Sequence, residues 1–137
     1  MVKDGEGASM LINVNVNGAA SPEDADLAAR TVANSPLVKT AVAGHDANWG
    51  RILCAIGYAD ANYDIHKVEV DLASKAGSIK VCVDGHGIAF DEDKALQILK
   101  EDEIDILVNL HDGSYAATAW GCDMTYEYVK INGEYRS

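Results

Sequence analysis

The sequence predicts an α+β fold: a single two-layer domain over residues 1–137, with a mixed or mostly antiparallel sheet and helices concentrated in the first half. Three observations lead to this prediction. Several short segments alternate apolar and polar residues, which is the period of a strand. Two Ser-Pro pairs open segments with helical spacing. No repeat or linker divides the chain, and 137 residues is the length of one domain.

The first half begins with a strand and continues with helices. From Ile12 to Asn17 apolar residues alternate with asparagines, and Gly18 to Ala20 end this strand. A Ser-Pro pair places a serine at the helix N-cap and a proline at the first helical position. This pattern predicts helices from Ser21-Pro22 and from Ser35-Pro36, the second reaching Val42 and closed by Gly44. After a loop over His45–Arg51, a further helix is expected over Ile52–Tyr58.

The second half is predicted to consist mainly of strands. Alternation indicates strands at Val68–Leu72, Ile79–Val83 and Ile104–Leu110. Asp84-Gly85 predicts a tight hairpin turn into a further strand at Ile88–Phe90. Asp91 is expected to cap a short helix to Leu99, and His111–Ser114 to form a turn. The last stretch, Ala117–Ser137, is expected to form one or two strands, with both faces covered or a bulge near Tyr128-Val129.

Composition and charge exclude several classes of function. The net charge of −11 disfavours binding to nucleic acid, because a phosphate backbone is repelled by such a field. No apolar run reaches the roughly 20 residues of a membrane-spanning helix, and the N-terminus lacks the pattern of a signal peptide. Cys54, Cys82 and Cys122 are widely separated in apolar sequence and are expected to be buried thiols. We therefore expect a cytoplasmic protein without membrane association.

No short motif indicates catalysis. The four histidines show no metal-ligand spacing, no CxxC pair occurs, and no metal site is predicted; surface or turn positions are expected for His45, His66, His86 and His111. The glycine-rich Asp4–Gly7 segment precedes a strand and lacks a Walker lysine, so it is not a phosphate loop. By motif chemistry alone, the chain is an α+β domain of unassigned activity.

Four blocks spread along the chain point further. They are Val2–Ala8, Ala33–Ala41, Asp46–Leu53 and Ala117–Ser137. Together, and in this order, they resemble the ornithine acetyltransferase family, whose bifunctional enzymes move an acetyl group from N-acetylornithine to glutamate. Two departures are mild: Ser9-Met10 stands where the family often has Thr-Lys, and Ala47 where it often has Pro.

The resemblance implies that this chain is the C-terminal part of a β chain. In the family a precursor cuts itself ahead of a threonine, which becomes the nucleophile; that residue is expected upstream of Met1, so no catalytic residue is assigned here. The implied partners are the α chain and the N-terminal part of the β chain, in an oligomeric enzyme. No cofactor is implied. Whether acetyl-CoA also serves as a donor, as in bifunctional members, stays open.

By motif position, the resemblance implies that Glu6, Asn132 and Ser137 bind substrate. A carboxylate pairs with an ammonium group, an amide both donates and accepts, and a hydroxyl does the same. The plainer interpretation is a solvated loop acid and a turn residue beside Gly133. Residues expected to serve the scaffold, with the aromatic ones packed, are Asn48, Trp49, Arg51, Trp120, Cys122 and Asp123.

Two functions are therefore considered. The first is the substrate-binding C-terminal domain of a glutamate N-acetyltransferase of arginine biosynthesis, inactive alone. The alternative is a stand-alone, non-catalytic module of the same fold that binds amino acids or serves assembly. An upstream reading frame with an Ala-Thr-Met-type cleavage site would favour the enzyme.

Overall fold

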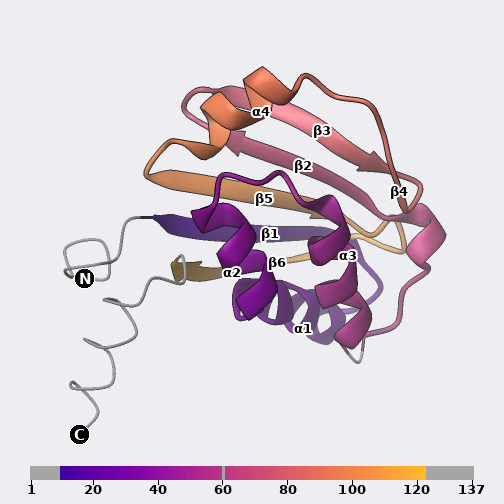
Figure 1. Cartoon of the computed structure of the whole chain (residues 1–137). Coiled ribbons are helices and arrows are strands. Elements are labelled where there is room, and N and C mark those ends of the chain that lie inside the picture. Colours follow the sequence, from indigo (N-terminus) through magenta and orange to yellow (C-terminus); the bar gives the residue numbers. More distant parts are fainter. Residues whose placement is uncertain (1–9, 60, 123–137) are drawn as a thin grey trace, which may run out of the picture.

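The structure is a computed structural model that describes residues 10–59 and 61–122. It contains one sheet with helices packed against it (Figure 1). The strands are β1 (Leu11–Ala19), β2 (Glu69–Ser74), β3 (Gly77–Val83), β4 (His86–Gly87), β5 (Glu103–Asn109) and β6 (Tyr115–Cys122). The helices are α1 (Pro22–Ala33), α2 (Pro36–Ala43), α3 (Trp49–Tyr58) and α4 (Glu92–Leu99), with a 3₁₀ helix, η1, at Ile65–Lys67.

The sheet is mixed, and its order is β4-β3-β2-β5-β1-β6. β1 and β5 are parallel, while the pairs β1–β6, β2–β3, β2–β5 and β3–β4 are antiparallel. Three of the four α-helices come before β2 along the chain. The predicted fold class is thus confirmed.

The core lies between one face of the sheet and the helices. Because side chains alternate along a strand, Ile12, Val14 and Val16 of β1 point to the helices and are fully or almost fully buried. They join Val32 of α1 and Ile56 of α3 in one apolar cluster. α4 covers the same face farther along the sheet. Its Leu99 lines a small hollow together with residues of α2, α3 and β2. The second face is covered by none of the helices in residues 10–59 and 61–122 (Figure 1).

The predicted helix starts are confirmed by their caps. The Ser21 hydroxyl accepts a hydrogen bond from the Asp24 amide at 3.1 Å, and Ser35 does the same for Val38 at 3.2 Å. The Asp91 carboxylate accepts from the amides of Asp93 and Lys94. These bonds satisfy amides that a helix N-terminus otherwise leaves without partners.

Two element boundaries differ from the prediction. α3 begins at Trp49, earlier than the expected Ile52, because the Asn48 side chain caps the Arg51 amide at 3.1 Å. The strand expected at Ile88–Phe90 was wrong: β4 is only His86–Gly87, and the chain then crosses from the sheet to α4. The turn before β4 is confirmed, since Asp84 and Gly85 have φ angles of 54° and 74°, as in a type I′ hairpin.

The cysteines differ partly from the expectation. Cys82 and Cys122 are buried, but Cys54 on α3 is exposed, because it lies on the side of the helix that faces solvent. In the described part of the chain, no helix has the length and apolar character that crossing a membrane requires.

Candidate functional site

The chain enters β1 and leaves β6 at the same end of the sheet. The two strands are antiparallel neighbours, with Leu11 opposite Cys122. In Figure 1 the start of β1 and the end of β6 lie together at the left. A site shared by Glu6, Asn132 and Ser137 requires such an arrangement, because these residues come from opposite ends of the sequence. All three lie outside the described residues, so their joint site stays a prediction.

A polar cluster occupies this end of the sheet. The Asn13 amide donates to a Glu103 carboxylate oxygen at 2.8 Å and to an Asp105 carboxylate oxygen at 2.9 Å. Asn13 is 9% exposed and is the buried polar residue of the described chain. The residue of β6 that is paired with Asn13 is Trp120. Within the described residues, one neutral amide thus donates a hydrogen bond to each of the two carboxylates and joins them.

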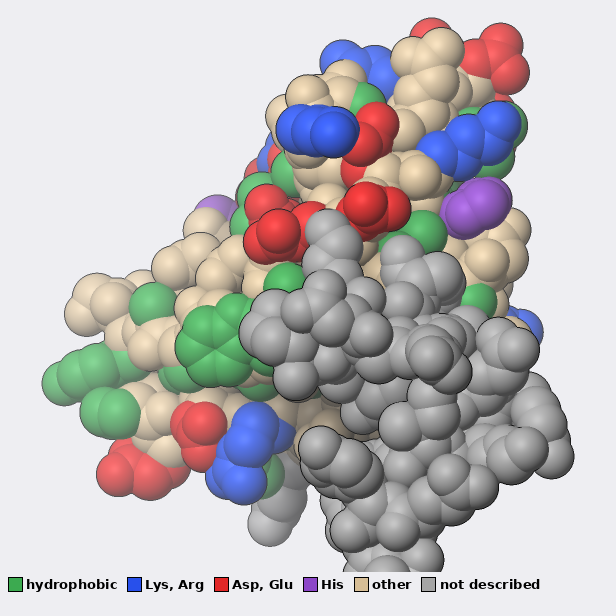
Figure 2. Space-filling view, turned by 90° about the vertical axis from the view of Figure 1, so that its left-hand side faces the viewer, with side chains coloured by type: hydrophobic (Ala, Val, Ile, Leu, Met, Phe, Trp, Pro, Cys, Tyr) green, Lys and Arg blue, Asp and Glu red, His purple; other side chains and the backbone are tan. Residues whose placement is uncertain are grey.

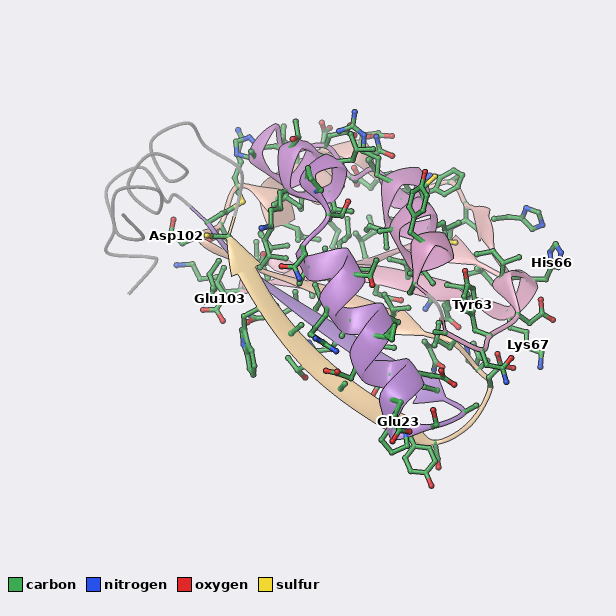
Figure 3. All side chains as sticks on the ribbon, turned by 90° about the horizontal axis from the view of Figure 1, so that it is seen from below. Glu23, Tyr63, His66, Lys67, Asp102 and Glu103 are labelled. Carbon is green, nitrogen blue, oxygen red and sulfur yellow. The ribbon has the colours of Figure 1, made fainter. Side chains whose placement is uncertain are left out.

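Further acidic residues surround the cluster. A hollow of about 260 Å³ is lined by Ser74, Lys75, Glu101, Asp102, Glu103 and Asp105. Figure 2, which looks at this end, shows acidic side chains gathered there, and Figure 3 places Asp102 and Glu103 at the end of β6. Lys75 lies 3.3 Å from Glu101 but is 84% exposed, so its charge is strongly screened. Glu103 and Asp105, which share a neutral amide, add negative charge at this hollow.

The opposite end of the same sheet face is organised around the Lys80 ammonium. Lys80 donates to Glu69 and, at 2.8 Å, to Asp71, while Nε2 of His111 lies 2.8 Å from Glu69. The hydrogen bonds from Lys80 and His111 lower the pKa of Glu69. The bonds to Asp71 and Glu69 raise the pKa of Lys80. The Lys80 ammonium therefore offsets part of the negative charge of Glu69 and Asp71.

A second ion pair lies beyond this cluster. Lys67 of η1 lies 3.1 Å from Asp112, and this hydrogen bond lowers the pKa of Asp112. Figure 3 shows Tyr63, His66 and Lys67 at the end of the molecule away from Asp102 and Glu103. The pair ties η1 to the turn after β5, which gives it a structural role.

Comparison with known proteins decides the family. Residues 1–137 match the model of the ArgJ family. The chain is 55% identical over its whole length to the arginine biosynthesis bifunctional protein ArgJ of Caldanaerobacter subterraneus, covering 34% of that protein. It is 48% identical to the mitochondrial ArgJ protein of Schizosaccharomyces pombe, covering 31% of it. The chain belongs to the ArgJ family.

A solved ArgJ structure has the same fold. The crystal structure of the arginine biosynthesis bifunctional protein ArgJ from Bacillus halodurans superposes with a TM-score of 0.87 at 44% identity. The match covers 98% of this chain and 62% of that one. The chain thus spans about a third of the length of the curated ArgJ relatives and part of the chain in the crystal structure.

Among the residues expected to serve the scaffold, Asn48 and Arg51 do so. Asn48 caps α3, and the Arg51 guanidinium donates to the carbonyl oxygen of Leu37 on α2 at 3.1 Å. Trp49 is partly buried against the core. The expectation that Trp120 packs was wrong, because its side chain lies on the uncovered face of the sheet and is 64% exposed. Asp123 lies outside the described residues.

The described residues offer little for covalent or metal chemistry. All four histidines are exposed, as expected. No three His, Cys, Asp or Glu side chains within the described chain are grouped so that they could hold a metal ion. Burial raises the pKa of the Cys82 thiol, which disfavours the reactive thiolate.

The sequence analysis missed the Asn13–Glu103–Asp105 cluster. A signal was present, because the alternation of Ile12–Asn17 places asparagines on the second face of the sheet. The parallel pairing with β5, which brings Asp105 opposite Asn13, is absent from any local pattern.

Proposed function

We propose that this chain is the C-terminal, substrate-binding part of an ArgJ enzyme that transfers an acetyl group from N-acetylornithine to glutamate in arginine biosynthesis. The observation on which this rests is the family match over all 137 residues, at 55% identity to an ArgJ protein. Glu6, Asn132 and Ser137 are proposed to bind the amino-acid substrate.

The pairing of β1 with β6 supports a site built from both ends of the chain. Leu11 lies opposite Cys122, so the two segments that hold the proposed residues begin on neighbouring strands. Glu6 precedes Leu11 by a few residues, whereas Asn132 follows Cys122 by more. At about 3.3 Å per extended residue, both segments can reach one substrate.

The acidic end of the sheet suits the proposed substrates electrostatically. Ornithine carries two ammonium groups, whereas glutamate and the acetylated compounds carry fewer. Negative charge from Glu103 and Asp105 favours the approach of an ammonium group to this end. Glu6 would then pair with that group directly, while Asn132 and Ser137 would bind the carboxylate by hydrogen bonds.

The remaining chemistry is proposed to come from the rest of the enzyme. Acyl transfer through a covalent intermediate needs a nucleophile, which we place in the polypeptide upstream of Met1. The partners are then the α chain and the N-terminal part of the β chain, in a cytoplasmic oligomer. No cofactor is proposed, and acetyl-CoA is an alternative acetyl donor to be tested.

Activity of the isolated chain is the first test. The purified chain is expected to show no turnover of N-acetylornithine, whereas the full-length protein is expected to be active and to cut itself. Turnover by the chain alone would contradict the proposal. Specific binding of glutamate by a chain whose gene encodes no upstream enzyme segment would favour the stand-alone module.

Kinetics of full-length variants test the site residues. Glu6→Ala and Asn132→Ala are each expected to weaken transition-state binding by about 1.5–3 kcal/mol, which lowers kcat/KM roughly 10- to 150-fold. Self-cleavage is expected to stay intact. Glu23→Ala and Asn62→Ala are matched controls on exposed residues and are expected to keep normal kinetics. Unchanged kinetics in the Glu6 and Asn132 variants would remove those residues from the site.

A further inference from the structure

Two consecutive residues of the turn after β5 bind β2 and η1. Nε2 of His111 lies 2.8 Å from a Glu69 carboxylate oxygen on β2. The Asp112 carboxylate accepts hydrogen bonds from the Asp64 amide at 2.8 Å and from Nζ of Lys67 at 3.1 Å. Asp64 caps η1 and Lys67 ends it, so Asp112 binds both ends of this 3₁₀ helix. We call these five residues the η1 clasp.

The backbone of the turn fixes the direction of the His111 side chain. His111 has a φ of 54°, in the left-handed region that residues other than glycine adopt uncommonly. Its amide donates to Oδ1 of Asn109 at 2.9 Å, and the amide of Asp112 donates to the Gly18 carbonyl oxygen at 2.7 Å. Such conformations persist where the surroundings hold them, and they are frequent in switch regions. Because the two side chains share one fixed turn, a shift that frees His111 also moves Asp112.

Carboxylates outnumber ammonium groups around the His111 ring. Hydrogen bonds from Lys80 and His111 lower the pKa of Glu69. The hydrogen bond from Lys67 lowers the pKa of Asp112. Both carboxylates therefore stay ionised near neutral pH, where a histidine ordinarily changes its charge. The titratable groups on the elements around this turn are the carboxylates of Glu69, Asp71, Asp64 and Asp112, the ammonium groups of Lys80 and Lys67, and the imidazole of His66.

We propose that the η1 clasp is proton-sensitive: it holds η1 against the sheet while His111 is protonated and opens more often when that proton is lost. A protonated ring donates from both nitrogens and forms a charge-assisted hydrogen bond with Glu69, which is about twice as strong as a neutral one. A neutral ring has one donor and one acceptor nitrogen, and an acceptor that faces the carboxylate is repelled. The contribution of the clasp is therefore present at acidic pH and is lost as the pH rises through the range of about 5–8.

η1 depends on the clasp because little of it is buried. None of the residues Ile65–Lys67 is buried, and a segment with few buried apolar contacts opens before the rest of the chain unfolds. Figure 3 shows Tyr63 and Lys67 together at the end of the molecule away from the acidic hollow. The side chains of Tyr63 and Ile65 pack against the core, so opening of the clasp exposes apolar surface. It also disturbs the turn after β3, since a Cβ on Gly85 would lie 2.3 Å from the Ile65 carbonyl oxygen.

Amide exchange in the full-length protein, followed by mass spectrometry, measures this opening. The reporter is a peptide with the amides of Asp64, Lys67 and Val68, which are hydrogen-bonded within the clasp or within η1. After correction for the intrinsic exchange rate, its protection is expected to be about threefold lower at about pH 8 than at about pH 5.5. The change is small because the paired side chains are partly exposed. Amides of β5 are expected to show no such change.

Two variants remove the proton-sensitive pair, and a third is the matched control. His111→Gln keeps a hydrogen-bond donor without a titratable charge, and Glu69→Gln leaves the turn unaltered but removes the charged partner. In both, the protection of the reporter peptide is expected to be equal at the two pH values. His66→Gln replaces another exposed histidine, on η1 itself, and is expected to keep the threefold change.

Three results would overturn the proposal. They are an unaltered protein whose reporter peptide is equally protected at both pH values, a change that persists in Glu69→Gln or in a folded His111→Gln variant, and a change that disappears in His66→Gln. If His111→Gln also loses protection in β5, its fold is disturbed, and the Glu69→Gln variant decides. The measurement needs no acetyl transfer, so its outcome is independent of the proposed function.

Discussion

The uncovered face of the sheet contains two clusters with the same plan and different central groups. At one end, the Asn13 amide bridges Glu103 and Asp105 of β5. At the other, the Lys80 ammonium bridges Glu69 and Asp71 of β2. In each case a donor on a neighbouring strand joins two carboxylates that are two residues apart.

The difference lies in charge and in burial. Asn13 is 9% exposed and neutral, so it satisfies hydrogen bonds but cancels no charge. The Lys80 side chain is 39% exposed and positive, so it cancels part of the charge of Glu69 and Asp71 at a more solvent-exposed position. The comparison shows how one sheet face can keep a negative field at the end where the chain enters and leaves. At the other end one ammonium offsets part of the charge of two carboxylates.

The largest expected effect comes from making the neutral bridge acidic. Asn13→Asp replaces a double donor by a third carboxylate between Glu103 and Asp105, where water is largely excluded. We expect a loss of about 3 kcal/mol in the free energy of unfolding at pH 7, measured with urea, and a smaller loss at acidic pH.

Asn15→Asp is the matched control for this change. The Asn15 side chain accepts a hydrogen bond from Thr118 at 2.7 Å, and an aspartate can accept it equally well. The control is expected to change the free energy of unfolding by less than about 1 kcal/mol. Equal losses in both variants would mean that the pairing of Asn13 with carboxylates has no special role.

The next effect concerns the turn that places His111 beside Glu69. Gly18 has a φ of 73°, and a Cβ there would lie 2.8 Å from the His111 nitrogen and would also meet the Asn109 side chain. Gly18→Ala is expected to cost about 2 kcal/mol in thermal or urea unfolding. Gly57→Ala on α3 is the control, because its Cβ would make only an ordinary contact; a gain of about 0.5–1 kcal/mol is expected.

A smaller effect is expected from removing the cationic bridge. Lys80→Met leaves Glu69 and Asp71 near one another without their shared ammonium. Since these side chains are partly exposed, solvent screens the repulsion, and we expect a loss of about 1 kcal/mol. Lys75→Met is the control: Lys75 is 84% exposed, and a change below about 0.5 kcal/mol is expected. A loss as large as that for Asn13→Asp would contradict the contrast between the two clusters.

The smallest effect is a pH dependence. The pKa of Glu69 is lowered from its ordinary value of 4.5, so its stabilising contribution is present above about pH 4.5 and is lost as the pH falls through the folded value. The difference in unfolding free energy between the unaltered protein and Glu69→Gln should therefore be below about 1 kcal/mol at pH 7 and vanish in acid. The same comparison in a Lys80→Met background should give a smaller difference, because the main cause of the shift is then absent.

Local sequence signals predicted the elements but not their neighbours. The caps by Ser21, Ser35 and Asp91 follow from hydrogen bonds within one helical turn, so a few letters suffice to find them. Asn48 carries the same signal for α3, whose start the apolar spacing alone predicts too late. The parallel pairing of β1 with β5 depends on tertiary packing and could not be read from either strand.

The candidate site divides in the same way. Family blocks indicated Glu6, Asn132 and Ser137, and the sheet supplies the proximity of the segments that precede Leu11 and follow Cys122. The exposure of Trp120 could not be predicted, because an aromatic residue in an alternating strand packs or not according to which face is covered.

The position of β1 also has a consequence for the time course of folding. Both of its neighbours come from the far end of the chain: Asn13 and Asp105 are 92 residues apart, and Asn15 and Thr118 are 103 residues apart. During synthesis at about 5–20 residues per second, β1 is therefore made roughly 5–20 s before its first partner strand, β5. Such distant contacts also slow the closing of the sheet after release. The nascent chain is thus most exposed to aggregation before β5 has emerged, and shielding of β1 by a chaperone would matter most in that interval.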